Sequence, residues 1–199
     1  MGKFKNQYRI ESARLNDWDY RNAGIYFITI CTYEHQHFFG KCGKGKMKLS
    51  TAGIIVQGCW YEIPRWNPHV ELGRFIVMPN HLHGILFLDD YLRRIEDANS
   101  SQNKRDEDVF SNVSTVSGEN EYYSEISSKS GSVSRMIQQF KSACTRHIQD
   151  VPPDLEFCWQ ERFHDHIIRN DAAFIRISDY IANNPANWSD DCFFSNDPS

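Results

Sequence analysis

Two strand-like runs separated by a two-residue break constrain the fold of this chain more than any other feature. Residues 70–78 and 81–88 are rich in Val, Ile, Leu and Phe, and Pro79-Asn80 lies between them. Proline interrupts a hydrogen-bonded ladder, and a Pro-Asn pair is typical of a turn. We therefore expect two strands that follow each other in the chain and pair as antiparallel neighbours.

Further strands and helices are expected around this pair. Residues 25–32, with the sequence IYFITICT, predict a buried strand because β-branched and aromatic residues dominate them. The other expected elements are a hairpin at 33–48, helices at 50–63, 133–148 and 170–185, and a strand at 163–168. Helices that alternate with hairpin-like strands favour an α+β domain with a mainly antiparallel sheet and helices on one face.

Composition narrows the class of protein. With 199 residues, of which 40% are hydrophobic and 14% aromatic, the chain can bury the core of one ordinary domain. No apolar run approaches the roughly 20 residues of a membrane helix, and the N-terminus lacks the apolar stretch of a secretory signal. The six cysteines form no C-x-x-C pair, which favours reduced cytoplasmic thiols over a disulfide framework or a zinc ribbon.

Charge is distributed unevenly along the chain. The net charge of -4 does not by itself indicate a nucleic-acid binder. Residues 1–88, however, hold 11 Lys or Arg against 6 Asp or Glu, so this half can present a basic face that the total conceals. Residues 98–130 contain nine Ser and four Asn without apolar periodicity, which predicts an acidic insertion in a single domain spanning 1–199.

The first candidate site is the H-x-H sequence at His81 and His83. Side chains two residues apart on a strand point to the same face, so the two imidazoles would lie side by side. The strand is otherwise made of Ile, Leu and Phe, and buried polar rings need partners that a divalent cation can provide. The alternative is a solvated or hydrogen-bonded histidine pair on an exposed face.

The second candidate site lies on the last predicted helix. Tyr180 and Asn184 are four residues apart and therefore one turn apart on one face, and Arg176 extends this stripe by another turn. A phenol can act as a nucleophile, and an amide oxygen can bind a hard metal ion. In the alternative, Tyr180 is a packed tyrosine and Asn184 helps to end the helix.

A second H-x-H pair occurs at His164 and His166, in the segment WQERFHDHIIRN. It could also supply a metal site, and the alternative is a surface segment with one structural histidine. Arg162 and Arg169 flank the pair and suggest contacts with backbone phosphates.

Five segments together resemble a known family: RLNDWDYRNAGIYFITICT, ELGRFIVMPNHLHGILFL, FKSACTRHI, WQERFHDHIIRN and ISDYIANNPANW. In this order and spacing they are similar to the REP-associated tyrosine transposases, a branch of the single-tyrosine HUH transposases of insertion sequences. The resemblance extends from about Arg14 to Trp188, apart from the insertion. It implies a ferredoxin-like α+β fold with a central antiparallel sheet, a homodimer, and a cytoplasmic bacterial protein that associates with the nucleoid when it acts.

The resemblance also implies a reaction. Members of this family cleave and rejoin single-stranded, hairpin-containing DNA through a 5′-phosphotyrosine, and they require Mg²⁺ or Mn²⁺. By resemblance the nucleophile is Tyr180, and the metal ligands are His81, His83 and Asn184. The expected DNA contacts are Lys141, Arg162, Arg169 and Arg176.

Two other functions are compatible with the same residues. One is a domesticated protein that binds DNA hairpins without turnover, and the other is a metal-dependent hydrolase that uses both H-x-H pairs and forms no tyrosine adduct. The chain departs from the family pattern in its acidic insertion and in lacking a tyrosine near Phe163 and His164. Its overall acidity also departs from that of a basic DNA binder and predicts weak or strongly salt-sensitive binding.

Overall fold

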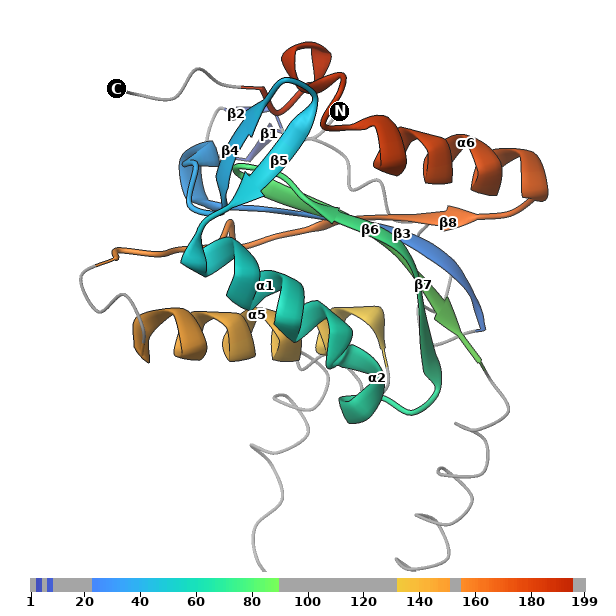
Figure 1. The fold of residues 1–199 in the computed structure, drawn as a ribbon. Coiled ribbons are helices and arrows are strands. Elements are labelled where there is room, and N and C mark those ends of the chain that lie inside the picture. The colour runs from blue at the N-terminus through green and yellow to red at the C-terminus, as the bar shows by residue number, and fades with distance from the viewer. Residues whose placement is uncertain (1–2, 5–6, 9–22, 90–131, 151–154, 195–199) are drawn as a thin grey trace, which may run out of the picture.

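The computed structural model describes residues 3–4, 7–8, 23–89, 132–150 and 155–194, and the predicted insertion at 98–130 lies outside them (Figure 1). The strands are β1 (Lys3–Phe4), β2 (Gln7–Tyr8), β3 (Gly24–Cys31), β4 (Gly40–Gly43), β5 (Lys46–Leu49), β6 (Val70–Val77), β7 (His81–Leu88) and β8 (His164–Ile168). The helices are α1 (Thr51–Tyr61), α2 (Ile63–Trp66), α5 (Val133–Asp150) and α6 (Asp171–Asn183), with 3₁₀ turns η1 (Tyr33–His35) and η2 (Trp188–Asp190).

A four-stranded antiparallel sheet, in the order β6-β7-β3-β8, forms the centre of the domain. The elements β3, α1, β6, β7, α5 and β8 follow one another in the β-α-β-β-α-β order of a ferredoxin-like fold. The predicted α+β, ferredoxin-like class is therefore confirmed, as is the antiparallel pairing of the two strands around Pro79-Asn80.

The helices cover both faces of this sheet, whereas the sequence suggested one. Helices α1 and α5 lie against one face, and α6 lies across the other (Figure 1). Helix α6 has its own apolar stripe, and Ile177 and Ile181 of that stripe pack against Ile85 and Ile168 of the sheet in a second, smaller hydrophobic cluster. None of the described helices combines the length and apolar content that crossing a bilayer requires.

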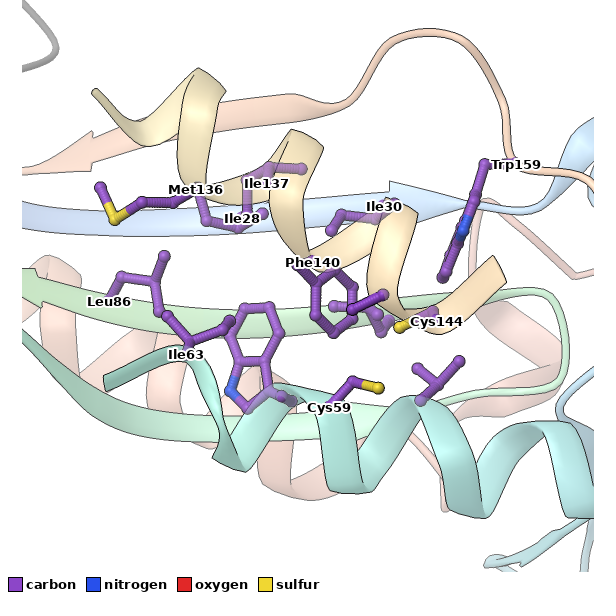
Figure 2. Packing of buried hydrophobic residues seen from close by; sticks show 14 of the residues in the cluster. Ile28, Ile30, Cys59, Ile63, Leu86, Met136, Ile137, Phe140, Cys144 and Trp159 are labelled. Carbon is purple, nitrogen blue, oxygen red and sulfur yellow. The ribbon is translucent and has the colours of Figure 1, made fainter. Parts of the chain in front are cut away.

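The larger hydrophobic core lies between the sheet and helices α1 and α5. Figure 2 shows Ile137 and Phe140 of α5 close to Ile28 and Ile30 of β3, in the same cluster as Ile63 of α2. All five side chains are essentially inaccessible to solvent. Removal of this apolar surface from water is the main favourable term that holds the sheet in place.

Gly84 lets strand β7 approach helix α1 at the position after His83. A Cβ atom built on Gly84 would lie 2.2 Å from Cζ2 of Trp60, which is fully buried in the core. No side chain larger than hydrogen fits there without moving the indole. The strand that carries the two histidines therefore packs directly against the core through its other face.

Predicted capping residues begin two of the helices. The Ser50 side chain accepts a hydrogen bond from the Gly53 amide at 3.1 Å, and the Asn170 side chain accepts one from the Ala173 amide at 2.8 Å. The helix expected over 50–63 is divided in two: α1 ends before Pro64, which lies in the first turn of α2. The missing N–H of proline costs nothing at that position, so a new helical turn begins there.

Candidate metal and nucleophile site

The two histidines of β7 lie side by side on the sheet face that α6 covers. The ring centroids of His81 and His83 are 4.5 Å apart, and the two side chains are 0% and 1% exposed. Leu82 between them is buried in the larger core on the opposite face. The prediction that both imidazoles share one face is confirmed. The alternative was wrong in placing the pair on an exposed face, whereas the hydrogen bonds that it expected are present at His81 Nδ1 and His83 Nδ1.

Tyr180 of α6 reaches over the sheet to this pair. Its hydroxyl lies 3.0 Å from His83 Nε2 and also donates a hydrogen bond to Asp191 Oδ2 at 3.0 Å. Phe27 of β3 contacts both rings, stacking on His83 and meeting Tyr180 edge to face. The tyrosine side chain stays 39% exposed. A substrate can therefore reach the phenol from solvent, while the histidines behind it are shielded.

Asn184 and Asp191 complete the site within the same chain. Asn184 Nδ2 donates to Asp191 Oδ2 at 2.6 Å, and Asn184 is 2% exposed. One ligand atom from each of His81, His83 and Asp191 lies within 4.8 Å of the other two. Sequence reasoning placed Asn184 here but missed Asp191, which follows η2 in a polar segment without any periodic pattern.

Two buried acceptors in the site lack a donor. His81 Nε2 and Asn184 Oδ1 have no hydrogen-bond partner among the described residues. A buried polar atom without a partner costs free energy, and native proteins usually satisfy it with a protein group, water or an ion. Imidazole nitrogens with amide and carboxylate oxygens form a donor set that suits Mn²⁺ and tolerates Mg²⁺. The residues present therefore fit a divalent cation.

Burial sets the protonation states of the site. It lowers the pKa of His81 well below 6.5, with a further contribution from the charge of His83. Burial also lowers the pKa of His83 to about 4, against the opposing effect of Asp191. Both imidazoles are consequently neutral near pH 7. The pKa of Tyr180 is raised above its usual value of 10, first by burial and then by the negative charge of Asp191.

A C-terminal segment, residues 188–194, covers the histidines from the solvent side. The ring of Phe193 lies 4.7 Å from that of His81, and the ring of Trp188 lies 5.8 Å from it. The Phe193 amide donates to Asp191 Oδ1 at 2.8 Å, which holds the carboxylate toward Tyr180. This segment therefore supplies both an apolar cover and an acidic side chain to the site.

The second H-x-H pair does not join this cluster. His164 and His166 are exposed on β8, with Asp165 buried between them. His164 and His83 both pair with Thr29 of the intervening strand, so they share a face at a separation of two strand spacings, about 10 Å. That distance is too large for one ion to bind both histidine pairs.

The expected DNA contacts lie outside the cluster as well. Lys141 Nζ donates to the three successive carbonyl oxygens of residues 160–162, at 2.7, 3.3 and 3.2 Å, and burial lowers its pKa to about 8. The contacts of this ammonium group in the structure therefore tie α5 to the segment that leads into β8. Arg162, Arg169 and Arg176 are exposed, and phosphate contacts by all four residues stay predictions.

Comparisons with known proteins agree with this fold. No protein-family model matches the chain. A protein of Haemophilus influenzae (strain ATCC 51907 / DSM 11121 / KW20 / Rd), described as an uncharacterized protein, is 30% identical over 180 residues, which is 90% of each of the two chains. The solved structure of a REP-associated tyrosine transposase bound to a REP hairpin is 17% identical, covers 92% of this chain and 73% of its own, and has a TM-score of 0.50.

The solved structure confirms, at the level of the fold, the resemblance that the sequence motifs indicate. The alignment with the bacterial relative extends over nearly the whole of both proteins. The chain therefore belongs to the same protein family as this Haemophilus influenzae protein, and it has the fold of the REP-associated tyrosine transposases.

Proposed function

We propose that this chain is a metal-dependent DNA transposase that cleaves and rejoins single-stranded, hairpin-containing DNA through a 5′-phosphotyrosine. The observation that carries the proposal is the contact of the Tyr180 hydroxyl with His83 Nε2, at 3.0 Å. Beside this contact lie two buried acceptors without donors, at His81 and Asn184. The hairpin bound to the solved transposase of the same fold supports hairpin DNA as the partner.

The metal ligands in this proposal are His81, His83 and Asn184, and Asp191 lies close enough to contribute a carboxylate oxygen. When bound there, Mg²⁺ or Mn²⁺ would supply Lewis-acid stabilisation of the negative charge that develops on a scissile phosphate. The two imidazoles are neutral near pH 7 because burial lowers their pKa values, so their lone pairs are available without loss of a proton.

Tyr180 is placed to act as the nucleophile. Its oxygen would form a bond to phosphorus while the bond from phosphorus to the 3′-oxygen breaks, which leaves a 5′-phosphotyrosine and a free 3′-OH. The hydrogen bond to Asp191 Oδ2 gives the phenol proton an acceptor during attack. A second DNA 3′-OH can reverse the step on the phosphotyrosine, so strands are joined without ATP.

The alternatives fit the geometry less well. A hairpin-binding protein without turnover has no need for a phenol, two imidazoles and a carboxylate within hydrogen-bonding reach of one another. A hydrolase that uses both H-x-H pairs needs them close together, whereas His164 and His166 are exposed two strands away from His83. The homodimer and the phosphate contacts of Arg162, Arg169 and Arg176 belong to this proposal as well, and a phosphate contact of Lys141 would require its ammonium group to leave the carbonyl oxygens of residues 160–162.

The test is to incubate the protein with Mn²⁺ and single-stranded DNA from the repeats that flank its own gene, and to separate the products under denaturing conditions. We expect 3′-labelled DNA to remain attached to the protein and 5′-labelled DNA to be released with a free 3′-OH. EDTA should prevent both products. Cleavage without a covalent complex would indicate a hydrolase, and hairpin binding without any cleavage would indicate the non-catalytic protein.

Asp191→Asn is expected to lower the raised pKa of Tyr180, since the carboxylate opposes formation of a neighbouring phenolate. The pKa should stay above the usual 10, because burial is the largest cause of the shift and is unchanged. The carboxamide retains an oxygen that can accept from Tyr180. Titration of the metal-free protein labelled at tyrosine ¹³Cζ would measure the change by NMR.

Asp190→Asn provides the matched control for this measurement. It removes one negative charge from the neighbouring residue of η2, which is exposed and is not among the groups that shift the pKa of Tyr180. We expect its Tyr180 titration to match that of the parent protein. Equal shifts in the two variants would mean that general charge, and not the Asp191 contact, raises the pKa.

A further inference from the structure

Asn80, in the turn between β6 and β7, is a fully buried polar residue beside the site. Its side-chain nitrogen Nδ2 donates to the carbonyl oxygens of His35 at 3.1 Å and Phe193 at 2.8 Å. Its own carbonyl oxygen accepts from both the amide and the hydroxyl of Thr32, each at 2.9 Å. Backbone and side chain of Asn80 are therefore held by separate sets of hydrogen bonds.

These contacts determine which way the amide of Asn80 points. Carbonyl oxygens only accept hydrogen bonds, so the two that face the side chain must face its nitrogen and not its oxygen. The Oδ1 atom is thereby directed at His81 Nδ1, at 2.9 Å. Because Oδ1 also only accepts, Nδ1 of His81 must carry the hydrogen.

The hydrogen on Nδ1 determines that the other ring nitrogen, Nε2, is unprotonated. A neutral imidazole has a single N–H, so a ring protonated at Nδ1 carries a lone pair at Nε2. His81 Nε2 is the buried atom that lacks a donor among the described residues. Free histidine favours the opposite tautomer, with the hydrogen on Nε2. The surroundings of Asn80 thus select the tautomer that can bind a cation through Nε2.

We propose that Asn80 is a positioning residue that locks His81 as the Nδ1-protonated tautomer and presents Nε2 to the metal site. The role of the cation rests on the proposed function, whereas the tautomer follows from the hydrogen bonds alone. The neighbouring histidine is held differently: His83 Nδ1 meets the Thr29 hydroxyl at 2.8 Å, and a hydroxyl can either donate or accept. Asn80 therefore acts on His81 and not on His83.

The lock has two independent anchors. One is the carbonyl of Phe193 in the C-terminal segment, and the other is the carbonyl of His35 in η1. Glu34 and His35 both have left-handed backbone, with φ values of 50° and 55°. Non-glycine residues adopt this conformation at a cost, and such strain concentrates at functional sites. If the C-terminal segment moves, the η1 anchor still orients the amide of Asn80.

The direct test is the tautomer of His81 in the metal-free protein, measured by long-range ¹H–¹⁵N NMR with ¹⁵N-labelled histidine near pH 7. We expect Nδ1 to carry the proton and Nε2 to be bare in the parent protein. Asn80→Leu, which removes both the acceptor and the donors, should shift His81 toward the Nε2-protonated form. Asn80→Asp keeps an acceptor of the same size and should retain the parent tautomer.

Thr29→Val is the matched control, because it removes the polar partner of the other histidine. It should change the signals of His83 and leave those of His81 as they are. A parent protein whose His81 is protonated at Nε2 would overturn the proposal, and this result does not depend on whether any variant folds.

Mn²⁺ affinity, measured by the loss of the free-ion EPR signal, gives a second readout. Loss of an outer partner of a ligating histidine typically weakens metal binding by roughly 10–100-fold, and we expect Asn80→Leu to fall in this range. Unchanged affinity and tautomer in a folded Asn80→Leu protein would also overturn the proposal. A parent protein with the expected tautomer but no Mn²⁺ binding would instead contradict the proposed function and leave the lock intact.

Discussion

Tyr180→Phe is expected to abolish the covalent protein–DNA complex while hairpin binding stays nearly unchanged. The phenyl ring can keep the edge-to-face contact with Phe27, whose ring centroid lies 6.3 Å away, and the contact with His83 at 5.1 Å. It lacks the oxygen that would attack phosphorus, so no phosphotyrosine can form. The measurement is the denaturation-resistant complex with 3′-labelled DNA in Mn²⁺, alongside a binding assay on the same hairpin.

Tyr61→Phe serves as the control for this variant. Tyr61 is 61% exposed at the end of α1, on the face of the sheet away from α6, and loses the same single oxygen atom. Its covalent complex should form at the parent rate. If Tyr180→Phe still forms a covalent complex, the nucleophile lies elsewhere and the proposed mechanism fails.

His81→Gln is expected to lower the rate of Mn²⁺-dependent cleavage by at least about 100-fold, because metal stabilisation of the transition state is worth several kcal/mol. Glutamine preserves most of the volume at this buried position but removes the imidazole Nε2. Hairpin binding should persist, since the variant changes neither the net charge near pH 7 nor an exposed surface. Single-turnover cleavage over a range of Mn²⁺ concentrations measures the effect.

His166→Gln makes the same chemical change in the second H-x-H pair and is the comparison for His81→Gln. His166 is exposed on β8, and we expect its variant to cleave at the parent rate. Equal losses in the two variants would favour the hydrolase that uses both pairs.

In the parent protein, protons should compete with the metal for the histidine nitrogens only in acid, near the His83 pKa of about 4, because burial disfavours protonated imidazoles.

Local patterns in the sequence were sufficient for much of the fold and for part of the site. The period-two spacing of His81 and His83 placed both rings on one face, and the four-residue spacing of Tyr180 and Asn184 placed them on one side of α6. Ser50 caps α1 as expected, because capping depends on bonds within one helical turn.

Features that depend on the three-dimensional path of the chain could not be predicted in this way. Asp191 reaches the site because η2 turns the C-terminal segment back over β7, and no periodicity in that segment signals the return. The position of α6 on the opposite face from α1 likewise follows from a second apolar cluster around Ile177. Asn80 was recognised as part of a turn, but its contacts with His35 and Phe193 join parts of the chain far apart in sequence.

The close contact between Gly84 and Trp60 has a consequence for how this protein can evolve. Strand β7 contacts the buried indole of Trp60 on one face and carries the imidazoles of His81 and His83 on the other face. Any substitution in α1 that shifts Trp60 is expected to shift β7 relative to α1, and both histidines would move with the strand. Packing in the core and the geometry of the site therefore depend on each other. We expect sequence variation along α1 to be tolerated least where its side chains contact β7.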